Sequence, residues 1–299
     1  MKNLLLYNYN IDTNDLIKVN DDISSFYIDY NKYYFIKFKR VEKDIENIYS
    51  ELNQKINRYH YIIKNKYGNI FTKDNDNSYI LIKINGPENN EINLADIIES
   101  QIIVSNNSNI DLKRDNWGEL WSEKVDYLEY QISELSKNHP TVIKTFSYYV
   151  GLAENAIEYF NMLDRKNIVL TYAQRRIKYP NVSKNYYNPL NLIVDYRVRE
   201  IGEYIKSNFF ENNDVFSELK MLANQNILNP LEYNLLYARL LYPSYYFDDI
   251  NKILEHEESD DILIKYVDKA NNYEKFLKKV YFLFSEKCQM IKIGWLIDR

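Results

Sequence analysis

The chain has 299 residues, of which 45% are hydrophobic and 27% are charged, and its net charge is −5. This length and composition allow a substantial buried core, so we expect one large domain or two lobes. Because Cys288 is the only cysteine, an internal disulfide is excluded and a reducing cytoplasm is the favoured compartment. Acidic and basic residues are interleaved and no apolar run approaches about 20 residues, so neither a nucleic acid nor a membrane is expected as a partner.

Several well-known catalytic and binding motifs are absent from the sequence. The first glycine is Gly68, so no G-x-G-x-x-G loop lies near the amino terminus, and there is no G-x-x-x-x-G-K-[ST]. Rossmann-type and Walker-type nucleotide sites are thereby excluded. The histidines, His60, His139 and His256, are too far apart to suggest a zinc site, and no G-x-S-x-G turn supports a serine hydrolase.

Residues 1–86 predict a small lobe made of strands and one helix. The segments 33–38 (YYFIKF) and 79–84 (YILIKI) are rich in β-branched and aromatic residues, as is typical of strands. Between them, apolar residues recur at helical spacing over about four turns, at Val41, Ile45, Ile48, Tyr49, Leu52 and Ile56. The turn-forming sequence Asn85-Gly86-Pro87 then marks the hinge at the end of this lobe.

Residues 87–299 are predicted to form a mainly helical lobe. A helix is expected over residues 117–135, where apolar residues fall on one stripe, and another over 141–163. The second of these is apolar on all sides, which is typical of a buried central helix. Further helices follow, and one of them begins near Pro230 and ends before Pro243.

The segment 168–206 has the outline of a catalytic loop followed by a metal-binding turn and a helix. One apolar run ends in a polar loop, and a second apolar run ends at Asp195. Kinases place a general base and an Asn on the loop after one strand and a metal-binding Asp after the next, which holds Mg²⁺ from two directions. Residues 174–181 (QRRIKYPN) overlay the kinase pattern H-R-D-x-x-x-x-N, with Asn181 at the place of the Asn. Asn181 and Asp195 are therefore the predicted metal ligands, facing a cleft between the two lobes.

The same overlay places an arginine where a kinase has its catalytic base. Arg176 stands at the position of the catalytic Asp, and its guanidinium cannot accept a proton near neutral pH. No catalytic residue is therefore predicted. We expect Arg176 to pair with Asp195 and to weaken Mg²⁺ binding. On this hypothesis Arg176→Asp strengthens Mg-nucleotide binding, and Asp195→Asn leaves folding largely unchanged.

A second register of the loop stays open. Asn188-Pro189-Leu190-Asn191 also resembles the end of a kinase loop. This register makes Asn191 the metal ligand, Glu200-Ile201-Gly202 the metal turn and Tyr186 the residue at the base position. We rank it second because Asn191 and Glu200 are too close for the usual pair of strands between the two ligands. The base position is non-acidic in both registers.

Two residues of the small lobe are candidates for nucleotide binding. In a kinase small lobe, a strand Lys holds the nucleotide phosphates and a helix Glu orients that Lys. Lys37 and Glu46 are the best-placed residues for these roles. A Lys on a half-buried strand is more often simply a solvent-facing residue, and this alternative is the stronger one for Lys37.

Six short segments match one known family in their order and spacing. They are 34–37 (YFIK), 66–69 (KYGN), 84–86 (ING), 120–124 (LWSEK), 151–156 (GLAENA) and 198–206 (VREIGEYIK). With them the chain resembles the spore-coat-associated kinase-like proteins, a branch of the aminoglycoside and choline phosphotransferase superfamily. The resemblance implies an α+β, protein-kinase-like fold with a sheet-plus-helix small lobe and a helical large lobe. Arg176 and Glu200 depart from the superfamily pattern, which has Asp at both places.

Two functions are compatible with this resemblance. The first is a degenerate, pseudokinase-like protein with a structural or assembly role in sporulation, in the cytoplasm or the spore coat, with coat proteins as partners. Its binding of ATP and Mg²⁺ would be weak or absent. The second is an ATP- and Mg²⁺-dependent phosphotransferase acting on a small hydroxylated metabolite. Arg176 favours the first, although a general base typically contributes only about 10²–10⁴-fold, so its loss does not by itself abolish a slow reaction.

Overall fold

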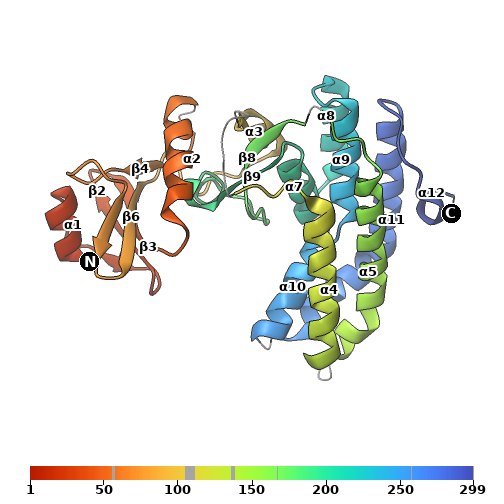
Figure 1. The fold of residues 1–299 in the computed structure, drawn as a ribbon, viewed down its shortest axis with the longest axis horizontal. Coiled ribbons are helices and arrows are strands. Elements are labelled where there is room, and N and C mark those ends of the chain that lie inside the picture. Colours follow the sequence, from red (N-terminus) through yellow and green to blue (C-terminus); the bar gives the residue numbers. More distant parts are fainter. Residues whose placement is uncertain (56–57, 105–111, 136–138, 167, 257, 299) are drawn as a thin grey trace. The chain divides into compact units, whose positions relative to one another are not determined.

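The computed structural model describes residues 1–299 except 56–57, 105–111, 136–138, 167, 257 and 299 (Figure 1). The chain divides into two compact units. The first contains Met1–Leu112 and Pro180–Ile193, and the second contains Lys113–Tyr179 and Val194–Arg299. A sheet dominates the first unit and helices dominate the second, as the sequence predicts.

The first unit is built on an antiparallel sheet in the order β1-β2-β3-β6-β4, with β5 also paired to β6. The strands are β1 (Ile17–Lys18), β2 (Ile23–Ile28), β3 (Asn31–Phe38), β4 (Tyr61–Ile63), β5 (Phe71–Asp74) and β6 (Asn77–Lys83). Strands β3 and β6 are the two strands predicted from the sequence. Phe35 lies opposite Leu81 and Lys37 opposite Tyr79. Because side chains alternate along a strand, these four share one face of the sheet.

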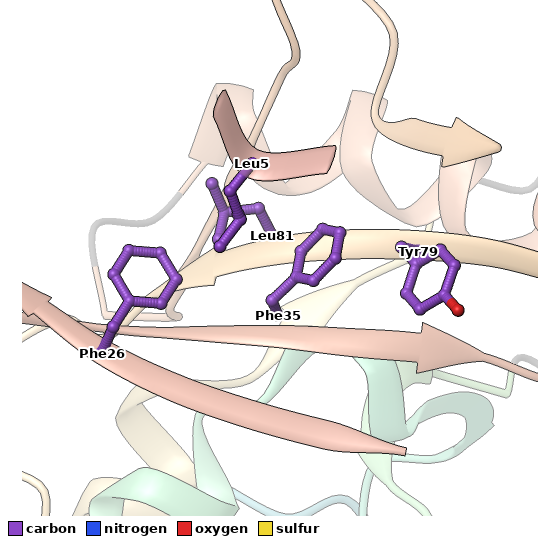
Figure 2. Close-up of a cluster of buried hydrophobic side chains, with 5 residues drawn as sticks. All are labelled: Leu5, Phe26, Phe35, Tyr79 and Leu81. Carbon is purple, nitrogen blue, oxygen red and sulfur yellow. The ribbon is translucent and has the colours of Figure 1, made fainter. Parts of the chain in front are cut away.

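Helix α1 (Lys2–Tyr9) packs against this face of the sheet. Figure 2 shows Leu5 of α1 gathered with Phe26 of β2, Phe35 of β3, and Tyr79 and Leu81 of β6. The rings of Phe35 and Tyr79 stack with their centroids 5.1 Å apart. The sequence pattern does not predict α1, because a helix of only two turns carries too few apolar positions to show a period.

Helix α2 (Glu42–Lys55) is the predicted helix between the strands. Ile45 and Ile48 are fully buried and Leu52 is buried one turn further on, so this part of the apolar stripe forms the buried face as expected, whereas Val41 precedes the helix and is 62% exposed. Ile56, the last residue of the predicted stripe, lies outside the described residues. The remaining elements of the first unit are α3 (Leu94–Glu99), β7 (Ile102–Ile103), α6 (Ser183–Tyr186) and η2 (Pro189–Asn191).

The first unit extends beyond its predicted end at residue 86. After the turn at Gly86, which has a φ of 72°, the chain hydrogen-bonds to the later part of the same unit. The Ile92 amide donates to the Asn181 carbonyl at 2.8 Å, and the Ser183 amide donates to the Asn90 carbonyl at 2.9 Å. A boundary read from local sequence misses these bonds, because they form only where the chain returns from the second unit.

The second unit consists mainly of helices. They are α4 (Trp117–Leu135), α5 (Pro140–Asn161), α7 (Arg199–Phe210), α8 (Val215–Gln225), α9 (Pro230–Leu241), α10 (Ser244–His256), η3 (Asp260–Leu263), α11 (Ile264–Ser285) and α12 (Gly294–Ile297). Proline begins α5 and α9, where its fixed φ and missing N–H are tolerated. Within the described ranges, no helix combines the length and the apolar composition that crossing a membrane requires.

Helix α9, rather than α5, is buried on all sides. Every residue from Glu232 to Leu241 is buried, whereas α5 exposes 55% of Ile143 and 37% of Tyr148. The prediction of an all-round buried helix over residues 141–163 is therefore wrong. Helix α5 packs against α4 and α9 but leaves its opposite face open. This exposed face also carries apolar residues, so the composition of α5 resembles that of a buried central helix.

Candidate functional site

A strand, a loop, a second strand and a helix form the segment that carries the candidate site. Strands β8 (Leu170–Gln174) and β9 (Leu192–Tyr196) are neighbours in a small sheet, and α7 follows β9 closely. All five residues of β9 are buried, and Asp195 lies near its end. The predicted arrangement of two strands on either side of a polar loop is confirmed.

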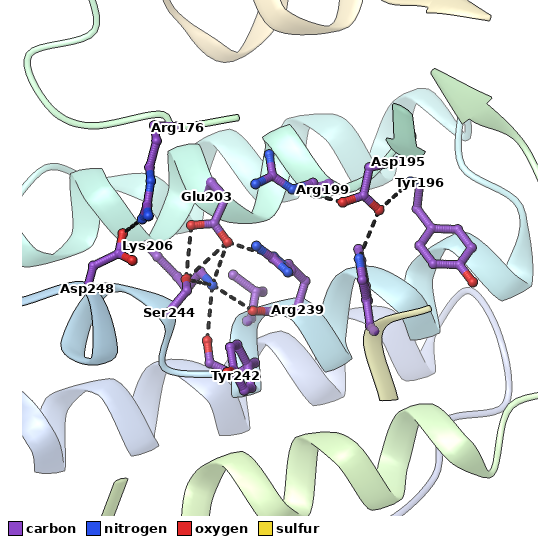
Figure 3. A network of polar contacts seen from close by, with 12 residues as sticks. Arg176, Asp195, Tyr196, Arg199, Glu203, Lys206, Arg239, Tyr242, Ser244 and Asp248 are labelled. Carbon is purple, nitrogen blue, oxygen red and sulfur yellow. Dashed lines mark hydrogen bonds and ion pairs between the residues drawn. The ribbon is translucent and has the colours of Figure 1, made fainter. Parts of the chain in front are cut away.

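Hydrogen-bond donors enclose the carboxylate of Asp195 (Figure 3). The side chain is only 1% exposed. Its Oδ1 accepts a hydrogen bond from Trp117 Nε1 at 2.8 Å and another from the Tyr196 amide at 2.7 Å. Its Oδ2 forms an ion pair with Nε of Arg199 at 2.9 Å. Both carboxylate oxygens are thus occupied by donors of the protein itself, one of which is a cation.

Arg199, in the first turn of α7, is the ion-pair partner of Asp195. Its Nη1 donates to the Gln174 carbonyl, and its Nη2 donates to the Arg175 carbonyl at 2.9 Å. The guanidinium therefore ties the end of β9 to the end of β8. The kinase pattern does not single out Arg199. The available signal is only its position four residues after Asp195, where the chain passes from β9 into α7.

Arg176 does not pair with Asp195. Its Nη1 contacts Oδ2 of Asp248 on α10, and its side chain is 58% exposed (Figure 3). The predicted pair of Arg176 and Asp195 is wrong. Arg199, at the start of α7, forms the ion pair with this carboxylate instead. The expected gain in Mg-nucleotide binding from Arg176→Asp loses its basis for the same reason.

Burial and ion pairing act in opposite directions on Asp195. Removal from water raises the pKa of Asp195 to about 6, while Arg199, Arg239, the Tyr196 amide and the Trp117 indole oppose this rise. At neutral pH the carboxylate is therefore ionised, and its charge is balanced by Arg199.

Glu203, one turn further along α7, is the centre of a second buried network. Its Oε1 accepts from Arg239 Nε at 2.6 Å and lies 2.8 Å from Lys206 Nζ. Lys206 Nζ also donates to the Arg239 and Tyr242 carbonyls at 2.9 and 3.0 Å and to the Ser244 hydroxyl at 2.7 Å. Figure 3 shows how this network joins α7 to the end of α9 and the start of α10.

The charges of this network stabilise one another. Burial alone raises the pKa of Glu203, but Arg239, Lys206 and Arg199 lower it well below the ordinary carboxyl value. Burial lowers the pKa of Lys206 to about 7, against the opposing charge of Glu203. The kinase pattern does not predict this network. Its signal in the sequence is an acid and a base three residues apart on one helix.

The residues of the second register have other contacts. Glu200 is 1% exposed, and its Oε1 accepts from the Gln174 amide at 2.6 Å, so it braces α7 against β8. Asn191 is exposed in η2, and the buried Tyr186 has its hydroxyl 3.0 Å from Ser100 Oγ. Asn191 belongs to the first unit and Glu200 to the second. A metal site shared by these two residues stays a prediction.

The predicted site residues of the first unit lie on strand β3, on helix α2 and in the loop before α6. Lys37 is partly exposed on β3, and Glu46 lies on the exposed side of α2. Among the described residues, neither of them forms an ion pair, so the Lys–Glu pair typical of kinases is not made. Asn181 is 6% exposed, and its carbonyl is bonded to Ile92. Nucleotide binding by Lys37 and Glu46 stays a prediction.

The surroundings of Asp195 do not suit a magnesium ion. Mg²⁺ requires oxygen ligands in near-octahedral geometry, whereas Asp195 faces N–H donors and a guanidinium. In the part of the chain that the structure describes, no group of three or more His, Cys, Asp or Glu residues is arranged to hold a metal ion. Asn181 and Asp195 belong to different units, so their joint role as ligands stays a prediction.

Comparison with known families identifies this arrangement of strands, loop and helices. The family model described as "Spore coat putative kinase YutH" matches residues 2–280. The chain belongs to this family. One relative is the endospore coat-associated protein YutH of Bacillus subtilis (strain 168), which is 25% identical over 206 residues. The match covers 60% of this chain and 61% of that protein, which is less than two thirds of the relative's length.

Solved phosphotransferase structures share the fold of this YutH-family chain. An aminoglycoside phosphotransferase from Alicyclobacillus acidocaldarius has a TM-score of 0.66 and 12% identity, covering 94% of this chain and 95% of that one. Spectinomycin phosphotransferase APH(9)-Ia, in complex with ADP and spectinomycin, has a TM-score of 0.59 and 13% identity, covering 99% and 95%. Amicoumacin kinase hAmiN, in complex with AMP-PNP, Ca²⁺ and Ami, has a TM-score of 0.54 and 9% identity, covering 92% and 91%. The predicted α+β, protein-kinase-like fold is confirmed.

Proposed function

We propose that this YutH-family chain is a degenerate kinase-fold protein with a structural or assembly role in the spore coat. Phosphoryl transfer needs a carboxylate that holds Mg²⁺ and, in kinases, a base near the substrate hydroxyl. The internal pairing of Asp195 with Arg199 is the observation that carries the proposal. A carboxylate already neutralised within the protein has little charge left to offer a metal ion.

Releasing Asp195 for a metal ion would require a large free energy. The ion would have to displace three donors, and Arg199 would be left as a buried charge without its partner. Breaking a buried ion pair in this way costs about 3–5 kcal/mol. That cost corresponds to a loss of roughly two to four orders of magnitude in Mg²⁺ affinity.

Arg176 supports the same proposal, because it concerns the second requirement, the general base. It stands where a kinase base accepts the proton of the substrate hydroxyl, and a guanidinium stays protonated at neutral pH. Its ion pair with Asp248 holds the positive charge at this place. A phosphotransferase built on this loop would therefore need a base from elsewhere in the chain.

The role in the coat rests on the family rather than on the site. The relative from Bacillus subtilis carries the name endospore coat-associated protein, and the family model spans nearly the whole chain. We infer that the chain acts during sporulation, at the coat or at its precursor in the cytoplasm. Other coat proteins are its proposed partners.

Thermal unfolding in the presence of Mg-ATP tests the proposal. A ligand at 100 times its dissociation constant stabilises a fold by about 2.7 kcal/mol, which raises the Tm by several degrees. We expect no such rise for this chain at millimolar Mg-ATP. Spectinomycin phosphotransferase, which has been solved with ADP, serves as the positive control.

The alternative function is an ATP- and Mg²⁺-dependent phosphotransferase acting on a small hydroxylated metabolite. It is favoured by the nucleotides found in the structural neighbours. Micromolar binding of Mg-ATP in a calorimetric titration, lost in Asp195→Asn, would support this alternative and contradict the internal role of Asp195. Near-UV circular dichroism must show that the variant is folded.

A further inference from the structure

The second unit contains a cavity of about 250 Å³ beside the loop that follows β8. Its walls come from this loop, the later part of α7, α10 and the start of α11. We call it the lysine cavity after Lys178, Lys252 and Lys265, which line it. Asp195 and Arg199 are not among its lining residues, whereas Glu203, Lys206 and Asp248 are, so the cavity borders the second network described above but not the Asp195 carboxylate.

One buried carboxylate serves two of these lysines. Asp249 is 6% exposed and accepts a hydrogen bond from the Tyr266 hydroxyl. Lys252 Nζ forms an ion pair with its Oδ1, and Lys265 Nζ lies 3.9 Å from its Oδ2. Burial alone raises the pKa of Asp249, but hydrogen bonds from Lys252 and Tyr266 hold it below the ordinary value. Asp249 is therefore ionised at neutral pH, and two ammonium groups share its single charge.

Lys178 brings a third ammonium group to the cavity. Lys178 is exposed, but desolvation by its neighbours lowers its pKa, and the positive charges of Lys252 and Arg176 lower it further, while Asp249 acts in the opposite direction. Among the described residues, Lys178 forms no ion pair with a carboxylate. Within the described residues, Asp249 is thus the only carboxylate at ion-pair distance from any of these three lysines, although Glu203, Glu211, Asp248 and Glu258 also line the cavity.

Across the described ranges, the other acidic residues of the lining do not pair with these lysines. Asp248 pairs with Arg176, and Glu203 is held in the buried network of α7, α9 and α10 (Figure 3). Glu211 and Glu258 are exposed, and within the described residues they form no ion pair with the three lysines.

We propose that the lysine cavity binds a small molecule through an oxyanion, a phosphate or carboxylate group, held between Lys178 and Lys252 with Lys265 completing the cluster. Ammonium groups bind oxyanions through charge-assisted hydrogen bonds, which are stronger where water is partly excluded. The cavity is smaller than the ≈ 300–1,000 Å³ of typical ligand pockets. A compact metabolite suits this volume, and the proposal does not depend on whether Mg-ATP binds.

Calorimetric titration with inorganic phosphate and with acetate, at an ionic strength kept constant with sodium chloride, tests this proposal. We compare the unaltered chain with Lys178→Gln and with Lys220→Gln, a matched change at an exposed lysine of α8 outside the cavity. We expect the unaltered chain and Lys220→Gln to bind equally and Lys178→Gln to bind about tenfold more weakly. The tighter of the two anions identifies the ligand as a phosphate or a carboxylate. Absence of binding, or equal binding by Lys178→Gln, overturns the proposal.

A second measurement avoids any effect of substitution on folding. The unaltered chain is treated with acetic anhydride with and without phosphate, and mass spectrometry follows the acetylation of individual lysines. We expect phosphate to slow the acetylation of Lys178 relative to that of Lys220, which serves as the internal reference. Equal slowing of both lysines, or no slowing, overturns the proposal.

Discussion

The carboxylate of Asp195 lies between an indole N–H, a backbone amide and the guanidinium of Arg199. All of these groups are buried and bonded to the carboxylate, and Arg199 donates in addition to the Gln174 and Arg175 carbonyls. A buried ion pair of this kind adds little stability by its presence, but removal of one partner leaves an uncompensated charge. The folding of the chain therefore depends on Asp195 even without a bound metal ion.

Asp195→Asn is accordingly expected to destabilise the chain by about 3–5 kcal/mol. This reverses the expectation from sequence that the substitution leaves folding largely unchanged. The matched control is Asp248→Asn, which removes an aspartate from the more exposed pair with Arg176 and should cost at most about 1 kcal/mol. Urea unfolding of the two variants measures the difference. Equal losses of unfolding free energy in the two variants would show that the burial of Asp195 does not account for the destabilisation.

The lowered pKa of Glu203 makes the folding stability of the chain depend on pH. Burial alone raises its pKa, but Arg239 and Lys206 bring it well below the ordinary value. A carboxylate with a depressed pKa contributes stability above its unfolded pKa of about 4.3, and the contribution is lost as the pH falls through the folded pKa.

We therefore compare urea unfolding of the unaltered chain and of Glu203→Gln across pH. The unaltered chain should be more stable by about 3–5 kcal/mol at neutral pH, because the variant removes the carboxylate with which Arg239 and Lys206 pair. The gap should narrow as the pH falls below about 4. A gap of constant size from neutral to acidic pH would speak against an ionised Glu203 in the folded chain.

Among the helices, α7 and α9 approach closely at Gly202. A Cβ atom at this position would lie 2.7 Å from Cγ and 3.2 Å from Cβ of Arg239. Arg239 cannot easily move aside because its Nε pairs with Glu203. Glycine is thus required here by the crossing of two helices, although it is an unfavourable residue within a helix.

Gly202→Ala is expected to lower the unfolding free energy by about 1–3 kcal/mol through this overlap. Gly151→Ala is the matched control, because Gly151 also lies within a helix but nothing surrounds the position of its Cβ within 4 Å. The control should gain up to about 1 kcal/mol from the better helix propensity of alanine. Thermal unfolding distinguishes the two, and stabilisation of both variants would contradict the close packing at Gly202.

At the scale of the whole molecule, the first unit is made from two separated stretches of chain. The His60 amide donates to the Tyr187 carbonyl at 3.0 Å, and the ring Nε2 of His60 lies 3.0 Å from the Lys184 carbonyl. Tyr186 is buried, with its hydroxyl against Ser100. The segment 180–193 therefore belongs to the core of this unit and is not merely a surface loop.

A fragment of residues 1–112 is expected to be less stable than the unit in the whole chain, because it lacks these contacts. Addition of a synthetic peptide of residues 180–193 should raise the urea midpoint of the fragment. A peptide of the same composition in scrambled order is the control. Near-UV circular dichroism follows the transition, and an identical midpoint with either peptide would show that the segment is dispensable for this unit.

The sequence by itself determined the local elements and the family. The strands β3 and β6, the helices α2 and α4 and the start of α9 were all predictable, because hydrophobic periodicity and proline act within one element. The order of β8, the polar loop and β9 was predictable for the same reason, and with it the position of Asp195. Short segments in the right order were sufficient to identify the kinase-like fold of the spore-coat family.

Only the tertiary structure decided which groups meet. Arg176 and Arg199 both belong to the segment that carries Asp195, and the packing of α7 beside β8 and β9 brings Arg199 to the carboxylate. The burial of α9, the extension of the first unit and the lysine cavity likewise depend on contacts between residues far apart in the chain. Such contacts are determined by packing and charge in three dimensions, which no local pattern records.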